Sequence, residues 1–366
     1  MAHLELDRLR VSSSGDGYVA TIDLQLDKGA IGCLFARDVQ GLNAVADAIT
    51  GLGGSYEGRI FLGGNVIDTT HRGRTGIAAC GFQIGLYDHL RAADNLALPL
   101  KTAGISDFEI VARVDATLDD FNLIESAGEY PEDLGEGEKL RLSFAKATMS
   151  SPQLILCYLT GACSLGFELY SLLSAIKIRS RQMGLTVLAI TDDGFSALTL
   201  ADQIAYLHDG AIIQQGSPRD IINSPERLEV AQDFTFPKLN TFEGIITEES
   251  PFLFVENKDQ YFNLPARLRD YFRARVGMHQ FMAARPERVQ LIRPDEVQRR
   301  GRNIVHLSRV DYLGFGAFAY FDFGVYEWCA FLPANKLVYP GMEMGVFVPE
   351  EDWLLIDNEG KVLLDL

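Results

Sequence analysis

The stretch FARDVQGLNAVADAITGL, residues Phe35–Leu52, links a strand-like run, Ala30–Phe35, to a helix-like run, Asn43–Leu52. A phosphate-binding loop at such a junction reads G-x-x-x-x-G-K-[ST]. Only the second glycine of that pattern remains here, and the lysine is missing. The eight positions are Ala36, Arg37, Asp38, Val39, Gln40, Gly41, Leu42 and Asn43. We therefore expect the frame of a nucleotide-binding domain without its phosphate chemistry.

Strand and helix patterns alternate on both sides of this junction. Leu154–Leu159 is a continuous apolar run, typical of a strand buried on both faces. His208-Asp209-Gly210 predicts a hairpin turn. Alternating strands and helices predict an α/β fold with a mainly parallel sheet. The other predicted strands are Leu4–Val11, Tyr18–Leu26, Gly58–Leu62, Thr186–Ile190, Ile204–Leu207 and Ala211–Gln215, and the predicted helices are Ser106–Asn122, Glu138–Met149 and Phe167–Met183.

The pattern changes after about Phe236, where short alternating strands are separated by Gly, Pro and Asp turns. Examples are Phe242–Ile246, Phe252–Glu256 and Ala317–Phe323. This texture predicts a small β-rich domain, a barrel or a sandwich. We expect one domain over residues 1–235 and a second over residues 236–366.

Composition excludes several classes of protein. The chain has 366 residues, 47% hydrophobic and 23% charged, as in a soluble globular protein. Its net charge of −17 argues against binding to nucleic acid or to anionic lipid, because both attract clustered Lys and Arg. No apolar run reaches the roughly 18–20 residues of a spanning helix, and the N-terminus does not resemble a signal peptide. The 5 cysteines are dispersed and predict reduced thiols, with no metal site.

Several segments, in this order, resemble the ATPase subunits of ABC transporters, and in particular the maltose-transporter ATPase family of carbohydrate importers. They are GFQIGLYDHLRAADNLALPLKTAG (Gly81–Gly104), LGEGEKLRLSFAKATMSSPQLIL (Leu134–Leu156), ALTLADQIAYLHDGAIIQQGSP (Ala197–Pro218), MAARPERVQLI (Met282–Ile292) and GVFVPEEDWLLIDNEGKVL (Gly345–Leu363). The resemblance covers nearly the whole chain. It implies a P-loop NTPase-like ATPase domain followed by a small all-β domain of OB/TOBE type.

The resemblance places the phosphate-binding lysine at Leu42 and the Mg²⁺-binding Ser/Thr at Asn43. A charge-assisted hydrogen bond worth about 1.5–3 kcal/mol is therefore absent. Asp38 adds negative charge where phosphate would bind, and Arg37 offers a partial offset.

The catalytic positions of the family are changed as well. The Walker B aspartate falls at Tyr158, the catalytic glutamate at Leu159, the aspartate of the following loop at Leu165 and the switch histidine at Asp192. Loss of the base alone removes about 10²–10⁴ in rate. Changes at all of these positions in one chain indicate relaxed selection on hydrolysis.

The signature segment, which in the family caps ATP held by the partner subunit, is half kept. Its positions read Leu134, Gly135, Glu136, Gly137 and Glu138. One interpretation is that this chain completes its partner's site less well than an intact signature does, since the helix N-terminus still offers its dipole. The other is a solvated acidic turn before a helix.

Features that face other proteins are retained. In the family, the region of Gln83 and of Leu86, Tyr87, Asp88 and His89 forms the groove that receives a coupling helix of the permease. A lone histidine is usually a cap or core residue, but this context favours an interface for His89.

The resemblance implies a catalytically impaired half of a heterodimeric ATPase pair in an importer for a sugar or polyol. Its expected partners are an intact ATPase subunit that holds Mg-ATP, two permease subunits and, indirectly, a solute-binding protein, with no nucleic acid. The chain is expected in the cytoplasm, on the inner face of the membrane. Two alternatives stay open. One is a weak ATPase that uses Arg37, Asn43 or Asp192 as unusual ligands. The other is a regulatory protein outside any transporter.

Overall fold

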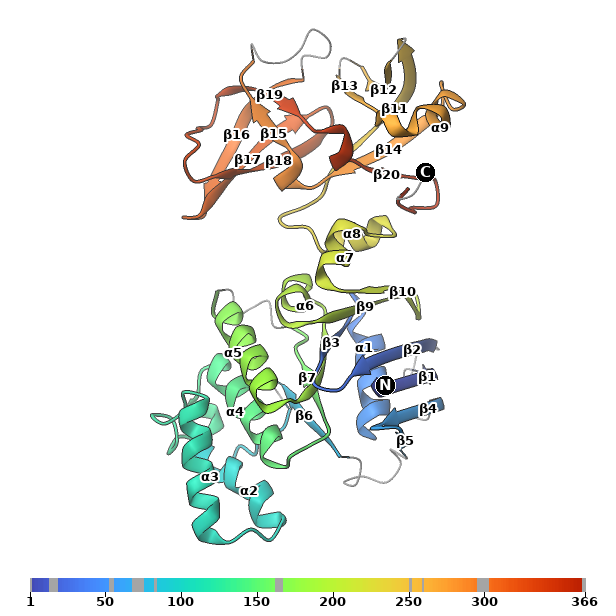
Figure 1. Ribbon diagram of the computed structural model, residues 1–366. Helices are drawn as coiled ribbons and strands as arrows, with labels where there is room; N and C mark the ends of the chain where they lie inside the picture. The colour runs from blue at the N-terminus through green and yellow to red at the C-terminus, as the bar shows by residue number, and fades with distance from the viewer. Residues whose placement is uncertain are drawn as a thin grey trace. The chain divides into compact units, whose positions relative to one another are not determined.

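The computed structural model describes residues 2–12, 19–52, 56–67, 76–81, 84–161, 167–249, 252–258, 260–294 and 303–363. The chain forms two compact units, Met1–Ile221 and Ile222–Leu366 (Figure 1). The second unit begins upstream of residue 236 because its side chains bind the preceding segment. Arg285 donates from Nη2 to the Ile222 carbonyl at 2.9 Å and from Nη1 to the Phe234 carbonyl at 3.0 Å.

The first unit is built on a sheet whose described part has ten strands, in the order β5-β4-β1-β2-β10-β9-β3-β8-β7-β6. The strands are β1 Ala2–Ser12, β2 Val19–Asp27, β3 Ile31–Phe35, β4 Tyr56–Leu62, β5 Asn65–Val66, β6 Ile77–Gly81, β7 Leu154–Tyr158, β8 Thr186–Thr191, β9 Gln203–His208 and β10 Ala211–Gly216. Each strand that we expected in this unit is present, with ends that differ by a few residues.

The sheet contains the parallel strands that we expected, together with an antiparallel part. Strands β6, β7, β8, β3 and β9 pair in parallel, and so do β2 and β10. Strands β5, β4, β1 and β2 pair antiparallel, as do β9 and β10. Consecutive strands joined by short links form hairpins, which are antiparallel. At the β9–β10 hairpin, Asp209 and Gly210 have φ of 46° and 79°, as a type I′ turn requires.

Helices cover this sheet on both sides. The helix α1 lies on one side, and α4 and α5 lie on the other side of β6 to β8, while α2 and α3 pack beside α4 (Figure 1). The helices are α1 Val39–Thr50, α2 Ala92–Thr102, α3 Asp107–Asp120, α4 Glu136–Met149, α5 Phe167–Met183, α6 Gly194–Leu200 and α7 Pro218–Asn223, the last of which crosses into the second unit.

The core of the first unit forms where α1 meets the sheet. Leu42, Val45, Ala46 and Ile49 repeat at helical spacing and are all fully buried. They pack with apolar side chains of β1, β2, β7 and β8. The first of the four, Leu42, is the residue that we predicted at the position of the phosphate-binding lysine.

The second unit is β-rich, as expected, with two antiparallel five-stranded sheets in its described part. Their orders are β13-β12-β11-β14-β20 and β15-β19-β16-β17-β18. The elements are α8 Leu228–Asp233, β11 Asn240–Glu249, β12 Phe252–Asn257, β13 Gln260–Asn263, α9 Arg269–Arg273, β14 His279–Ala284, β15 Gln290–Ile292, β16 Ile304–Tyr312, β17 Gly316–Phe323, β18 Tyr326–Pro333, β19 Glu343–Phe347 and β20 Leu354–Ile356. These sheets are consistent with the small OB/TOBE-like domain that we predicted.

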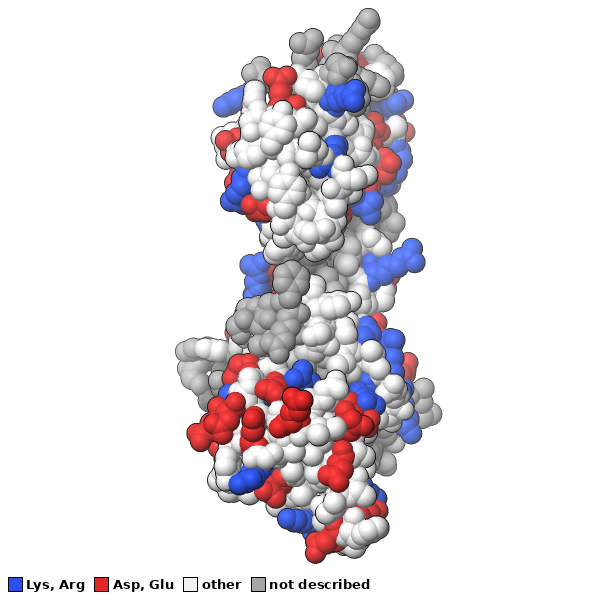
Figure 2. Space-filling view, turned by 90° about the vertical axis from the view of Figure 1, so that its left-hand side faces the viewer, with Lys and Arg blue, Asp and Glu red and all other residues white. Residues whose placement is uncertain are grey.

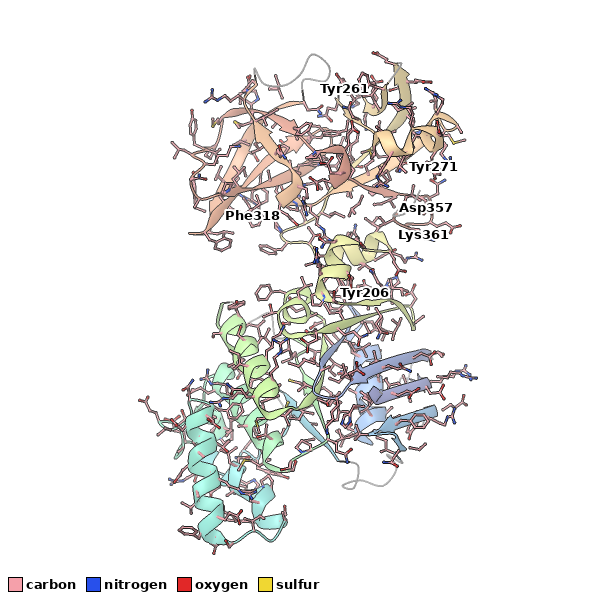
Figure 3. The ribbon with its side chains drawn as sticks, viewed as in Figure 1. Tyr206, Tyr261, Tyr271, Phe318, Asp357 and Lys361 are labelled. Atoms are coloured by element: carbon pink, nitrogen blue, oxygen red, sulfur yellow. The ribbon has the colours of Figure 1, made fainter. Side chains whose placement is uncertain are left out.

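Aromatic side chains fill the interior of the second unit. Trp328 is fully buried and stacks on Phe262 with ring centroids 5.7 Å apart. A smaller cluster forms around Phe318 on β17, which lies against Phe331 at 5.3 Å (Figure 3). This unit therefore has a hydrophobic core of its own.

The cysteines within the described residues are buried free thiols, as we expected. They are Cys33, Cys80, Cys157 and Cys329. Cys163 lies outside the described residues.

Candidate functional site

The β3–α1 junction is shorter than a phosphate-binding loop. Strand β3 ends at Phe35 and helix α1 begins at Val39, so most of the positions compared with the loop are helical. The Phe35 ring packs against Tyr206 of β9, with centroids 5.1 Å apart, which supports the end of the strand (Figure 3). Ala36 is buried and donates its amide to the Thr191 carbonyl at 3.3 Å.

Asp38 is the N-cap of α1. Its carboxylate accepts hydrogen bonds from the amides of Gln40 at 3.0 Å and Gly41 at 3.3 Å. These N-terminal amides are the groups that bind phosphate in nucleotide-binding loops. The sequence suggested that Asp38 repels phosphate. The structure shows in addition that this carboxylate bonds to the amides themselves.

Neither Leu42 nor Asn43 carries a positive charge that could bind phosphate. The Leu42 side chain is fully buried in the core under α1, and Asn43 is half-buried. Arg37 is exposed, and Gly41 is buried within the first turn of the helix. A triphosphate with its magnesium needs a lysine and an oxygen ligand here; the junction has no lysine, and Asn43 offers an amide oxygen in place of a hydroxyl.

Tyr158 and Leu159 close the carboxyl end of β7 with apolar packing. Leu159 is fully buried and donates its amide to the Ile190 carbonyl at 2.9 Å. Burial raises the pKa of Tyr158 to about 12. The nearby Thr50 hydroxyl acts in the opposite direction and lowers the pKa of Tyr158. The hydrogen of this hydroxyl is donated to the Ala46 carbonyl. Tyr158 Oη has no hydrogen bond of ordinary geometry within the described chain.

Asp192, which we predicted at the position of the switch histidine, has a structural partner. Its carboxylate accepts the amide of Gly161 at 2.9 Å, which links the segments that follow β7 and β8. The adjacent Asp193 caps α6 by accepting from the Ser196 amide at 2.8 Å. Leu165, expected in the loop after β7, lies outside the described residues.

The signature positions begin α4, and their two glutamates differ. Glu138 accepts the amide of Gly135 at 3.0 Å and the Ser126 hydroxyl at 2.7 Å. These hydrogen bonds, that of Ser126 first, lower the pKa of Glu138. Glu136 is exposed and pairs with Lys139 at 2.9 Å. Glu138 thus caps its own helix, and Glu136 is the carboxylate that this turn presents to solvent, while Leu134 and Gly137 are buried.

The segment 84–91 is anchored from α2. Asn95 is fully buried and accepts the Tyr87 amide at 2.8 Å. Its Nδ2 donates to the carbonyls of Tyr87 and Leu90, both at 3.0 Å. Within the segment, Leu86 is half-buried, and Asp88 and His89 are exposed. Gln83 lies outside the described residues.

Helix α4 anchors the same segment from the other side. Ser143 donates to the Ile84 carbonyl at 2.6 Å and accepts the Gly81 amide at 3.1 Å. Lys146 donates to the Gly85 carbonyl, and its ammonium lies 3.6 Å from the centroid of the Tyr87 ring.

Sequence reasoning missed the residues Asn95, Ser143 and Lys146, which hold this segment. The signal that was available is a polar residue on the buried face of a helix, since such a residue needs a hydrogen-bond partner. The partners of these three residues lie elsewhere in the sequence, so only the fold identifies them.

The helical face of the first unit is acidic. Figure 2 shows many Asp and Glu side chains and few Lys and Arg on the side that carries α3 and α5. The described helices include none that is long and apolar enough to cross a membrane. In the same residues, no group of three or more His, Cys, Asp or Glu side chains is arranged to hold a metal ion.

Comparisons with known proteins agree with this architecture. No family model matches the chain. It is 28% identical over 227 residues to the spermidine/putrescine import ATP-binding protein PotA of Hahella chejuensis. The aligned residues are 62% of this chain and 61% of that protein. It is 27% identical over 252 residues to the sn-glycerol-3-phosphate import ATP-binding protein UgpC 2 of Agrobacterium fabrum, with 69% and 67% covered. The chain is a homologue of ABC importer ATP-binding subunits.

The alignment with a further relative continues into the second unit of this chain. PotA of Mannheimia succiniciproducens is 26% identical over 315 residues, which are 85% of this chain and 82% of that protein. Among solved structures, cbiO1 of Clostridium perfringens, described as part of the ABC transporter complex cbiONQ, has a TM-score of 0.51 and 17% identity. It covers 60% of this chain and 90% of its own, and it shows the ABC ATPase fold.

Proposed function

We propose that this homologue is the catalytically impaired half of a heterodimeric ATPase pair in an ABC importer. Its relatives are named as import ATP-binding proteins. An importer subunit of this kind passes the closing motion of an ATP-bound pair to permeases. The chain would act as the scaffold of the pair, and an intact partner would supply the hydrolysis.

The observation that carries this proposal is the β3–α1 junction. The Asp38 carboxylate takes the amides of Gln40 and Gly41, and Leu42 is buried in the core. A nucleotide that bound here would have to displace a carboxylate already bonded to the helix N-terminus, with no lysine to offset the charge. We infer that the chain does not hold Mg-ATP tightly by itself.

The partner must then carry the working site. A homodimer would contain two impaired sites and could not drive transport, so we propose a second, intact ATPase subunit that binds Mg-ATP. The signature turn of this chain would face that nucleotide. Glu136 is its exposed carboxylate, and Glu138 is engaged with Gly135 and Ser126. We therefore propose Glu136, and not Glu138, as the residue that weakens the partner's site.

Two permeases and a solute-binding protein complete the proposed importer, which places the chain in the cytoplasm on the inner face of the membrane. Segment 84–91 is the proposed contact with a permease, because Tyr87, Asp88 and His89 are exposed on an anchored backbone. We propose a sugar or polyol as solute, supported by the relatives named for glycerol-3-phosphate. The relatives named for spermidine and putrescine make a polyamine the competing outcome of a transport assay.

Calorimetry with Mg-ATP on the purified chain tests the impaired site. We expect no binding tighter than about 1 mM and no Mg²⁺-dependent turnover above background. Micromolar binding would overturn the proposal and favour the weak ATPase with unusual ligands. In that event Arg37→Ala or Asn43→Ala should abolish the binding, while Gln40→Ala, an exposed neighbour, should leave it intact.

Purification from native membranes tests the assembly. We expect the tagged chain to copurify with a second ATPase that has an intact G-x-x-x-x-G-K-[ST] loop and with two permeases. A chain that copurifies with neither would favour the regulatory alternative.

A further inference from the structure

Lys146 differs from the other residues that anchor segment 84–91. Asn95 and Ser143 bind the backbone of the segment. Lys146 binds both the backbone, at the Gly85 carbonyl, and the ring of Tyr87, whose centroid is 3.6 Å from its ammonium. Among these three anchors, Lys146 is the one whose contacts set the direction of an exposed side chain.

The ring that Lys146 holds belongs to an exposed pair. Tyr87 is 45% exposed, and the His89 ring lies edge-on to it with centroids 6.0 Å apart. Aromatic side chains with an apolar body and a polar edge are frequent anchors of protein interfaces. The orientation of the Tyr87 ring therefore decides what shape the segment offers to a partner.

Glycine at position 85 brings its carbonyl to Lys146. Gly85 has φ of +93°, and a Cβ there would lie 3.0 Å from Ser143 Oγ and 3.1 Å from the Ala79 carbonyl oxygen. The backbone follows this path because no side chain is present. Lys146 and Ser143 are one helical turn apart on α4, so both reach the same turn of the segment.

The charge of Lys146 is not held by a carboxylate. Lys146 makes no ion pair with Asp or Glu in the described part of the chain, and burial lowers its pKa to about 8. Among the described residues, the titratable group in contact with it is the phenol of Tyr87, whose ring lies against the imidazole of His89. A half-buried ammonium over a ring is attracted to its face, and this attraction requires the charge.

We propose that Lys146 is a positioning residue: its charged ammonium orients the Tyr87–His89 pair for docking of the membrane partner, and loss of its proton releases the pair. The docking part of this inference rests on the proposed function. The local part, which concerns Lys146 and the Tyr87 ring, does not. Lys146 belongs to α4, the helix that starts at the signature turn. Through its contact with Tyr87, this one helix connects the signature turn to segment 84–91, the proposed permease contact.

The local part is tested on the isolated full chain labelled with ¹³C-tyrosine. The ring signals of Tyr87, assigned with Tyr87→Phe, should show an inflection near pH 8. Lys146→Met should abolish this inflection, and Lys146→Arg should keep the charged-state signals through pH 9 because guanidinium stays protonated. Lys139→Met, on the same helix but paired with Glu136, is the control and should keep the inflection.

Ring signals that stay constant from pH 7 to pH 9, below the range in which phenols ionise, or an inflection near pH 8 that persists in Lys146→Met, would overturn the proposal. If Lys146 had a purely structural role, Lys146→Met would destabilise the fold, but the Tyr87 ring signals would not follow the charge of Lys146. Urea unfolding of the same variants distinguishes the two, and measurement above pH 7 avoids protonation of histidine.

The docking part is tested on the importer purified in detergent with its permeases. Lys146→Met should weaken retention of the permeases by about tenfold at pH 7, and Lys146→Arg should restore it. Equal retention by wild type and Lys146→Met would overturn the docking part. If no permease copurifies with wild type, the proposed function fails, and the tyrosine titration still decides the local part.

Discussion

The β3–α1 junction and the segment 84–91 belong to the same unit but treat their polar groups in opposite ways. At the junction, Asp38 satisfies the helix amides from within, and Leu42 is buried. In segment 84–91, Asn95 and Lys146 form hydrogen bonds to the backbone, and the Tyr87 side chain stays exposed. At the junction the described carboxylate bonds to its own helix, whereas the segment presents exposed side chains on an anchored backbone.

The β3–α1 junction and segment 84–91 therefore meet different physical requirements. If the junction does not bind phosphate, as we propose, it is more stable with apolar side chains and a local cap than with charges, because unpaired buried charges are costly. A region that docks another protein gains from a backbone held rigid before binding, because less entropy is lost on association. The predictions below test each side of this comparison, from the largest expected effect to the smallest.

The largest effect should come from restoring the missing lysine. Leu42→Lys places an ammonium among apolar side chains at a position with no exposed surface. We expect a loss of roughly 3 kcal/mol or more in the free energy of unfolding, measured by urea denaturation. Asn43→Lys, at the half-buried next position, is the matched control and should lose much less. A stable Leu42→Lys that binds Mg-ATP would break the comparison.

A smaller loss is expected from crowding the end of β7. A Cβ on Gly81 would lie 2.8 Å from the Tyr158 carbonyl oxygen and 2.9 Å from the Tyr158 Cβ. Gly81→Ala should therefore cost about 1–3 kcal/mol in urea denaturation. Gly128→Ala is the control, because its new Cβ meets only the flexible end of Arg91 at 3.7 Å. Equal stability of both variants would show that Tyr158 is not tightly packed.

Removal of the cap of α1 should have an intermediate effect. Asp38→Ala leaves the amides of Gln40 and Gly41 without their acceptor and should cost about 1 kcal/mol of unfolding free energy. Asp38→Asn keeps an acceptor and should be close to wild type. Should thermal denaturation find Asp38→Ala as stable as wild type, the cap would not be what closes the junction.

The smallest effect separates the two glutamates of the signature turn. The pKa of Glu138 is lowered in the folded chain, so its charged form stabilises the fold above the ordinary glutamate value of 4.5. That stability is lost as the pH falls through the folded-state pKa. Glu138→Gln should cost less than about 1 kcal/mol at pH 7, since the group is partly exposed, and nothing at acid pH.

Glu136→Gln is the control for this prediction, because its carboxylate pairs only at the surface with Lys139. Its stability should follow wild type from pH 7 to pH 3 in urea titrations. The same pH dependence in both variants would contradict the assignment of Glu138 as the cap and Glu136 as the exposed carboxylate.

Most of the fold was predictable because strands and helices carry their own periodicity. The helical run after Asn43 and the buried run Leu154–Leu159 both appear as expected. The start of α1 was not predicted, because the loop pattern suggested a turn through Gly41, and the cap by Asp38 extends the helix to Val39. The antiparallel part of the sheet was not predicted, because the pairing of β4 with β1 brings together strands that are far apart in the chain.

By itself, the sequence determined the identities of Leu42, Tyr158, Leu159 and Asp192, and the family resemblance predicts that they replace the lysine, the Walker B carboxylates and the switch histidine. Only the tertiary structure decided what those positions do instead. It decided also that Asn95, Ser143 and Lys146 hold segment 84–91. The physical reason is that hydrogen bonds and burial join residues far apart in the chain, and local patterns contain no information on which distant groups will meet.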